Sequence, residues 1–168
     1  MAETERRPKG LLDTSVVIDL ESLDPVDLPV ELAVSAVTMA ELATGPEATR
    51  DPEERARRIG LIQHAEDTFD QLPLDIAAAR VYGRVYAAVT AAGRKARGRR
   101  TLDLLIAAVA LSNELPLYTH NVGDFVGLEE LIDVVAVPYP DAPDAPHTLP
   151  APAGAGGDQP ADPPEDRP

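Results

Sequence analysis

Four acidic residues stand beside apolar segments of the sequence, where a carboxylate is unfavourable unless it has a structural or functional role. Asp13 directly follows the apolar residues 10–12, and Asp103 opens an apolar run. Glu41 is flanked by apolar residues on both sides, and Asp124 comes shortly after the short segment 117–119. In an open parallel sheet, sites form at the carboxyl ends of the strands, where the following helices begin. We therefore expect these four carboxylates to converge.

Converging carboxylates need a proton or a cation between them. Two like charges about 4 Å apart cost about 4 kcal/mol at an effective dielectric constant of about 20. The sequence has no cysteine, and its three histidines, His64, His120 and His147, are scattered. Oxygen ligands alone favour Mg²⁺ or Mn²⁺ over zinc. Such an ion suits phosphate-ester chemistry, because it activates water and neutralises charge on phosphate oxygens.

Each acid also has a structural explanation. Asp103 suits the first turn of a helix capped by Thr101, because an acid there favours the helix dipole. Asn121 and Asp124 together fit a capping pair at the start of a helix. An exposed position on its helix would account for Glu41. Asp13 is the hardest of the four to explain in structural terms, since a carboxylate that directly ends a buried strand lacks an obvious partner. The recurrence of acids at four such places favours a shared site.

The elements that position these acids alternate along the chain. Short apolar runs predict strands at 10–13, 32–35, 72–74, 117–119 and 131–137. Longer segments predict helices at 16–20, 37–43, 52–69, 76–92 and 101–111. Pro52 starts the third of these helices and Asp75 caps the fourth. Strands that alternate with helices predict the α/β class, with a parallel sheet covered on both faces.

Composition divides the chain into three parts. The sequence has 168 residues and a formal net charge of −14. Residues 138–168 hold 10 of the 17 prolines and few large apolar side chains. This predicts a disordered, acidic, proline-rich tail. Residues 1–9 are mostly polar and predict a flexible leader, which leaves 10–137 as one folded domain.

The same composition excludes several classes of protein. No apolar run reaches the roughly 18 residues of a membrane span. The first ten residues lack the apolar core of a secretory signal. The absence of cysteine excludes a disulfide scaffold and a thiolate metal site. We expect a cytoplasmic protein that does not bind membranes.

The net charge hides a basic segment. Residues 76–102 contain no acid and seven of the 15 basic residues. Five of the seven lie directly before Asp103, and these are Arg94, Lys95, Arg97, Arg99 and Arg100. A solvated loop would explain them, but arginine forks also suit phosphate oxygens, and the position beside Asp103 favours RNA binding. With aromatic residues at 4%, we expect phosphate contacts and shape to dominate recognition over base stacking.

Four sequence blocks together resemble the PIN-domain ribonucleases, and more narrowly the VapC toxins of bacterial toxin–antitoxin pairs. The blocks are Leu-Leu-Asp-Thr-Ser-Val-Val-Ile at 11–18, Ala-Glu-Leu-Ala-Thr-Gly at 40–45, Asp-Leu-Leu-Ile-Ala-Ala at 103–108 and Thr-His-Asn-Val-Gly-Asp-Phe at 119–125. Each block alone is weak, but their order and spacing make the likeness specific. It extends over about residues 10–137; the leader and the tail depart from the family pattern.

The resemblance implies a PIN-like, doubly wound α/β fold and a metal-dependent endoribonuclease. Asp13, Glu41, Asp103 and Asp124 match the family's acidic positions, which are both catalytic and metal-binding. The polar positions that support them are Ser15, Thr119 and Asn121. The resemblance further implies Mg²⁺ or Mn²⁺ as cofactor, a VapB-like antitoxin as partner, a homodimer, and structured RNA such as transfer or ribosomal RNA as substrate, with inhibition of translation and growth.

Two other functions deserve comparison. A phosphotransfer or phosphatase domain also carries aspartates at strand ends, but it needs a second acid close to the first, and here Thr14 and Ser15 follow Asp13. A catalytically silent PIN-like module would bind RNA or a partner without cleavage. The presence of all four acids favours the enzyme.

Overall fold

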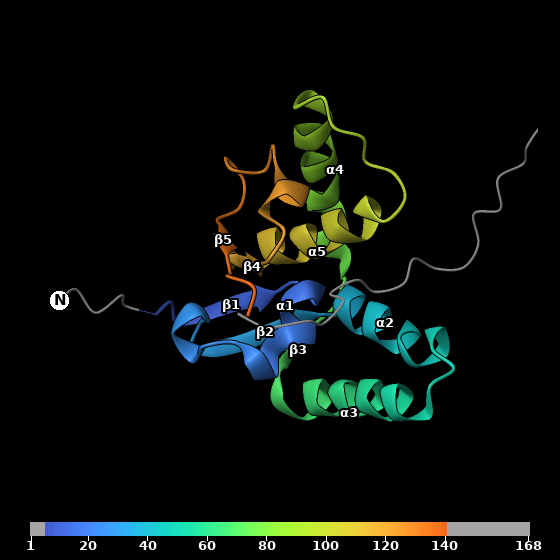
Figure 1. Cartoon of the computed structure of the whole chain (residues 1–168). Helices are drawn as coiled ribbons and strands as arrows, with labels where there is room; N and C mark the ends of the chain where they lie inside the picture. The colour runs from blue at the N-terminus through green and yellow to red at the C-terminus, as the bar shows by residue number, and fades with distance from the viewer. Residues whose placement is uncertain (1–5, 141–168) are drawn as a thin grey trace, which may run out of the picture.

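Five short parallel strands form the centre of the structure (Figure 1). The computed structural model describes residues 6–140 of the 168-residue chain, and within them the strand order is β3-β2-β1-β4-β5. The strands are β1 (Lys9–Leu12), β2 (Glu31–Ser35), β3 (Asp70–Leu72), β4 (Leu117–Thr119) and β5 (Val134–Ala136). Every neighbouring pair is parallel. The predicted parallel sheet is confirmed.

Five α-helices connect and cover these strands. They are α1 (Thr14–Asp19), α2 (Ala36–Thr44), α3 (Pro52–Thr68), α4 (Ile76–Ala91) and α5 (Arg100–Ser112), as described between residues 6 and 140. Short 3₁₀ turns occupy η1 (Leu20–Ser22), η2 (Pro25–Asp27), η3 (Pro46–Ala48) and η4 (Val122–Phe125). As predicted, Pro52 opens α3, and the side chain of Asp75 caps α4 by accepting from the backbone N–H of Ala78 at 2.9 Å.

Alternating side chains of the strands build two cores, one on each face of the sheet. Leu11 and Leu117 pack with α4 and α5 on one face. Leu12 and Tyr118 pack with α1 and α3 on the other face. Because successive strand residues point to opposite faces, short apolar strands such as Gly-Leu-Leu fill both cores. Figure 1 shows α4 and α5 on the opposite side of the sheet from α3.

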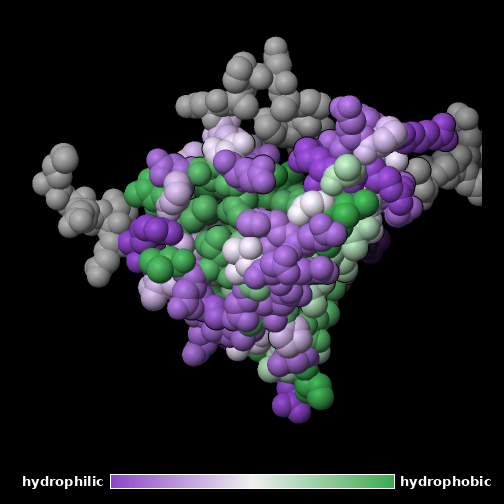
Figure 2. Space-filling model, turned by 90° about the horizontal axis from the view of Figure 1, so that it is seen from below, coloured by the Kyte–Doolittle hydropathy of each residue, from purple (hydrophilic) through white to green (hydrophobic). Residues whose placement is uncertain are grey.

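The charged helix α3 lies on the outside of its layer. Ala65 is the only residue of α3 that is buried. Viewed from that side, the molecule presents mainly hydrophilic surface with hydrophobic areas between (Figure 2). This agrees with the many charged side chains of the helix.

The strand order makes the sheet doubly wound and identifies its functional edge. The chain moves outward from β1 through β2 to β3, and then returns to the other side of β1 with β4 and β5. The connections therefore diverge between β1 and β4. Crevices at such a switch point, at the carboxyl ends of the strands, are where ligands bind in open α/β sheets.

Four predicted strands differ in extent from the observed ones: those predicted at 10–13 and 32–35 by a single residue at one or both ends, and the other two by more. The strand predicted at 72–74 lies at 70–72 instead, because Pro73 has no N–H to continue the ladder. Its polar residues Asp70 and Gln71 are tolerated since β3 is an edge strand. The strand predicted at 131–137 shortens to 134–136, and Leu131 belongs to a turn that bonds to Leu128.

Residues 6–9, which belong to the predicted leader, make contacts with the folded domain. Lys9 already belongs to β1, and the guanidinium of Arg6 donates to the carbonyl oxygens of Leu28 and Pro29 at 2.8 and 2.7 Å. Arg7 forms an ion pair with Asp133. Residues 6–9 are therefore fastened to the sheet by bonds that a polar composition does not reveal.

Of the predicted leader and tail, residues 1–5 and 141–168 lie outside the described residues. Among residues 6–140, no helix is both long and apolar enough to cross a membrane.

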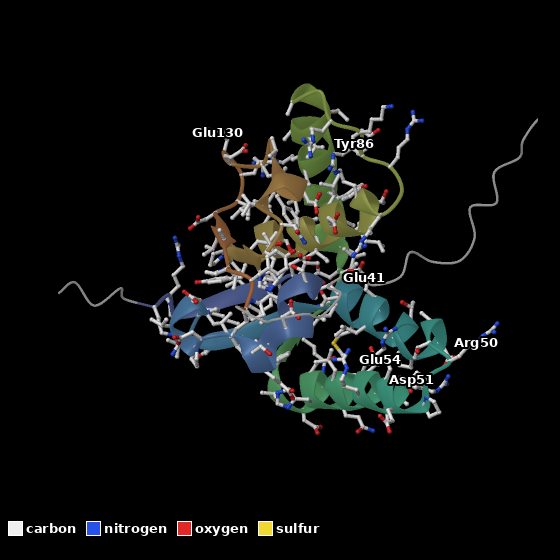
Figure 3. All side chains as sticks on the ribbon, in the orientation of Figure 1. Glu41, Arg50, Asp51, Glu54, Tyr86 and Glu130 are labelled. Atoms are coloured by element: carbon white, nitrogen blue, oxygen red, sulfur yellow. The ribbon has the colours of Figure 1, made fainter. Side chains whose placement is uncertain are left out.

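An arginine joins α3 to the end of α2. The guanidinium of Arg58 donates to the carbonyl oxygen of Gly45 at 2.7 Å and to Glu54 Oε1 at 2.6 Å. Glu54 also accepts from Arg57, and these two arginines lower the pKa of Glu54 to about 2. The side chain of Arg58 is 17% exposed, whereas that of Arg57 is 59% exposed. Figure 3 shows Glu54 on α3 beside α2.

We predict that Arg58→Met lowers the free energy of unfolding by about 2 kcal/mol, because it removes the charged donor of the Gly45 carbonyl and leaves Glu54 with Arg57 as its remaining arginine partner. Arg57→Met, the matched control, should cost less than about 1 kcal/mol since its pair is exposed. Urea unfolding of both variants at neutral pH measures the difference. Equal losses would show that Arg58 does not join the two helices.

Candidate active site

Asp13 is held at the carboxyl end of β1 by two hydroxyl groups. Its side chain is buried, and its Oδ2 accepts hydrogen bonds from Ser15 Oγ at 2.8 Å and from Thr119 Oγ1 at 2.9 Å. Asp13 precedes α1 in the capping position, yet its carboxylate makes no capping bond to that helix. The carboxylate therefore does not cap α1 and lies instead at the crevice between β1 and β4. The predicted supporting residues Ser15 and Thr119 both contact it.

Glu41 reaches the same region from α2. Its Oε2 accepts a hydrogen bond from Thr14 Oγ1 at 2.5 Å. Burial raises the pKa of Glu41, the Thr14 bond opposes that rise, and the charge of Asp13 adds to it. Figure 3 shows Glu41 between α2 and α5. Thr14 was not among the predicted site residues, although its place beside Asp13 at a helix start is a signal for a second hydroxyl.

Asp103 carries the largest electrostatic strain of the four acids. Burial, and after it the negative charges of Asp13, Asp124 and Glu41 in that order, together raise the pKa of Asp103 to about 7. Arg99 acts in the opposite direction. The four predicted acids therefore share one electrostatic environment. Raised carboxylate pKa values in a cleft are typical of functional sites.

The structural explanations considered for these acids find limited support. Asp103 does lie in the first turn of α5, but the helix begins at Arg100, so Thr101 is inside the helix and does not cap it. Asn121 stands before η4 without a capping bond from its side chain. Its Oδ1 instead accepts from Tyr139 Oη at 2.9 Å. Neither residue of the proposed capping pair is thus explained by capping.

A cavity of about 480 Å³ unites most of the predicted residues. The residues that line it are Asp13, Thr14, Ser15, Glu41, Lys95, Arg97, Arg99, Arg100, Asp103, Asn121, Asp124 and Tyr139. Thr119 lies behind Asp13, fully buried, and takes no part in the lining. Tyr139 is a lining residue that no sequence pattern singled out.

The basic segment before α5 forms part of this cavity. Lys95, Arg97 and Arg99 contribute to the lining. Arg100 pairs with Asp124 at 3.5 Å between Nη2 and Oδ1. Arg94 does not line the cavity, since it donates to the carbonyl oxygen of Gly123 at 2.8 Å and so fastens the segment to η4. The predicted RNA-binding role of Arg94 stays a prediction, and the structure adds a contact that holds the segment against η4.

The donor chemistry of the cavity fits a hard divalent cation. It offers four carboxylates and several hydroxyl and amide oxygens, without thiolate or imidazole. Among residues 6–140, however, no three histidine, aspartate or glutamate side chains stand close enough together to hold an ion by themselves. Mg²⁺ is commonly held by one or two carboxylates, with waters completing its octahedron. Asp13, buried at the end of β1, and Asp103, half-buried in the first turn of α5, would be the residues to hold such an ion.

Comparison with known proteins decides the family. The PIN domain model matches residues 10–125. The chain is 39% identical over 123 residues to Ribonuclease VapC5 of Mycobacterium tuberculosis, a match that covers 71% of this chain and 87% of that protein. It is 40% identical over 102 residues to Ribonuclease VapC8 of the same organism, over 60% of this chain and 89% of that one. The chain belongs to the VapC family of PIN-domain proteins.

Solved structures agree with this assignment. The fold is similar to the VapBC-5 toxin–antitoxin structure from Mycobacterium tuberculosis, with a TM-score of 0.66, 37% identity, and coverage of 78% of this chain and 98% of that one. It is also similar to VapBC-1 from nontypeable Haemophilus influenzae, with a TM-score of 0.58, 28% identity, and coverage of 74% and 95%. The predicted PIN-like fold and family are confirmed.

We predict that Asp103→Asn raises the melting temperature of this VapC-family protein by several degrees at pH 8 in a chelating buffer. The variant removes a carboxylate that is buried near three others, a relief of about 1 kcal/mol or more. Thermal denaturation followed by circular dichroism measures it. The control Glu130→Gln removes an exposed acid remote from Glu41 (Figure 3) and should leave the melting temperature nearly unchanged. A less stable Asp103→Asn would contradict the argument.

Proposed function

We propose that the chain is a Mg²⁺- or Mn²⁺-dependent endoribonuclease and the toxin of a toxin–antitoxin pair. The observation that supports this most is the cavity, in which four carboxylates and four basic side chains face the same space. Acids alone would repel RNA, and bases alone would only bind it. The names of the relatives VapC5 and VapC8 as ribonucleases point the same way.

The chain's own residues divide the work in the proposed reaction. A divalent ion bound here would supply an activated water and neutralise charge on the phosphate. Asp13 and Asp103 would hold that ion, with Glu41 and Asp124 completing its charge balance. Ser15 and Thr119 keep the carboxylate of Asp13 in one orientation through their hydrogen bonds. Lys95, Arg97 and Arg99 would hold the phosphates on either side of the scissile bond.

The proposed partner is a VapB-like antitoxin, since the similar solved structures are VapBC complexes. Structured RNA as substrate, inhibition of translation, a homodimer and a cytoplasmic location stay predictions of the family resemblance. The silent module remains the second candidate. The lack of three closely grouped ligands among residues 6–140 is the observation that favours it.

We predict that Asp13→Asn and Asp103→Asn each reduce RNA cleavage by about 10³-fold or more, as expected for residues of one catalytic unit. Purified variants would be incubated with total bacterial RNA and Mg²⁺, and new 5′ ends counted by sequencing. Circular dichroism checks that the fold survives, and Glu130→Gln should cleave normally. Full cleavage by both aspartate variants would refute the assignment, and no cleavage by the wild type would favour the silent module.

We predict that Arg97→Gln with Arg99→Gln weakens RNA binding and flattens its salt dependence. Both side chains are exposed and line the cavity, and each lost phosphate contact lowers the slope of log K against log salt by about 0.7. Fluorescence anisotropy with a labelled single-stranded RNA at several salt concentrations measures the slope.

The matched control is Arg50→Gln with Arg57→Gln, which removes equal charge at the α2–α3 side of the molecule. Arg50 lies far from Glu41 in Figure 3. This pair should leave the slope nearly unchanged. Equal slopes for both double variants would mean that net charge, and not the basic segment, sets the affinity.

A further inference from the structure

Tyr139 brings an aromatic ring to a cavity otherwise made of charged and small polar groups. It is the one aromatic residue among those that line the cavity in the described part of the chain. Tyr139 is 47% exposed and lies three residues after the end of β5. The proposed phosphate chemistry makes no use of it.

The orientation of the ring is fixed from two sides. Tyr139 stacks on the imidazole of His120, with centroids 4.3 Å apart and an interplanar angle of 18°. Its hydroxyl donates to Asn121 Oδ1 at 2.9 Å. The prolines at 138 and 140 restrict the backbone on both sides. A ring held in this way loses little conformational freedom when a ligand stacks on it.

His120 in turn connects the ring to the site. Its side chain is completely buried, and Nδ1 donates to the carbonyl oxygen of Val137 at 2.9 Å, since a carbonyl only accepts. Its Nε2 lies 3.6 Å from Asp19 Oδ2 at the end of α1. The backbone N–H of His120 points to Ser15 Oγ at 3.4 Å, the hydroxyl that holds Asp13. The stack therefore rests on the same framework as the acids.

From this placement we infer that Tyr139 is the stacking platform for a nucleobase of the RNA, next to the phosphate held in the cavity. The inference rests on the proposed function, because it takes RNA as the ligand. Lys95, Arg97 and Arg99 suit the charged backbone, and the tyrosine ring suits the flat face that every base presents. One stacking position is compatible with the sequence prediction that phosphate contacts and shape dominate recognition over base stacking.

The experiment compares three labelled probes of about twelve units each: oligoadenylate RNA, oligouridylate RNA and an abasic ribose-phosphate chain. Binding is measured by anisotropy with Mg²⁺ in an Asp13→Asn background, where the proposed chemistry is blocked. Tyr139→Leu should weaken oligoadenylate binding about tenfold and oligouridylate binding less, because adenine has the larger face. Its affinity for the abasic chain should not change.

Further variants separate stacking from mere support of Asn121. Tyr139→Phe keeps the ring and loses the bond to Asn121, so it should bind oligoadenylate like the parent. Tyr139→Trp should restore the preference for adenine, and it provides the test should the leucine variant fail to fold. Tyr86→Leu is the matched control, since Tyr86 is 46% exposed on α4 and far from Glu41 (Figure 3).

The outcomes also separate this inference from the proposed function. Equal weakening of all three probes by Tyr139→Leu, or an equal loss in Tyr139→Phe, would overturn the stacking role even when the wild type cleaves RNA. A wild type that neither binds nor cleaves RNA would overturn both. Selective loss of base-containing probes in the leucine variant alone supports the inference.

Discussion

The mutual repulsion of carboxylates at the switch point is the constraint on which the rest of this structure depends. The end of β1 and the first turn of α5 place Asp13 and Asp103 in one site, and burial together with the neighbouring carboxylates raises the pKa of Asp103 to about 7. Two kinds of group, hydroxyls and a guanidinium, reduce that repulsion. Hydroxyls of Ser15 and Thr119 hold one carboxylate, Thr14 holds Glu41, and Arg99 offsets part of the charge from the rim.

The fold tolerates this concentration of charge because buried apolar packing next to the acids offsets their electrostatic repulsion. Leu11 and Leu12, directly before Asp13, are fully buried in opposite cores and fix the end of β1. Ile106 and Ala107 likewise fix α5 after Asp103. A site supported by buried neighbours on a strand and a helix cannot relax by moving its acids apart. This is a common balance, in which stability is given up where function needs strained groups.

Much of this arrangement was predictable from the sequence, because local patterns carry it. Acids at the ends of apolar segments located Asp13 and Asp103, and the alternation of elements gave the parallel sheet. Contacts between distant segments could not be predicted from local patterns. Examples are the bond of Arg94 to Gly123, 29 residues away, and the stack of Tyr139 on His120. The contacts of residues 6–9 and of Tyr139 were unpredictable for the same reason, since a polar or proline-rich composition gives no sign of tertiary bonds.

The net charge of the whole chain differs in sign from the charge of the basic segment beside the cavity. A value of −14 argues against RNA, yet Lys95, Arg97 and Arg99 stand at the rim of the acidic cavity. Arg100 already forms an ion pair with Asp124. Lys95, Arg97 and Arg99 are more exposed than Arg100, and they are therefore the residues that attract phosphate most. The acids below them remain under-compensated in the chain alone. Any cation that binds there, whether a metal ion or a basic side chain of a partner, therefore stabilises the fold by mass action as it binds.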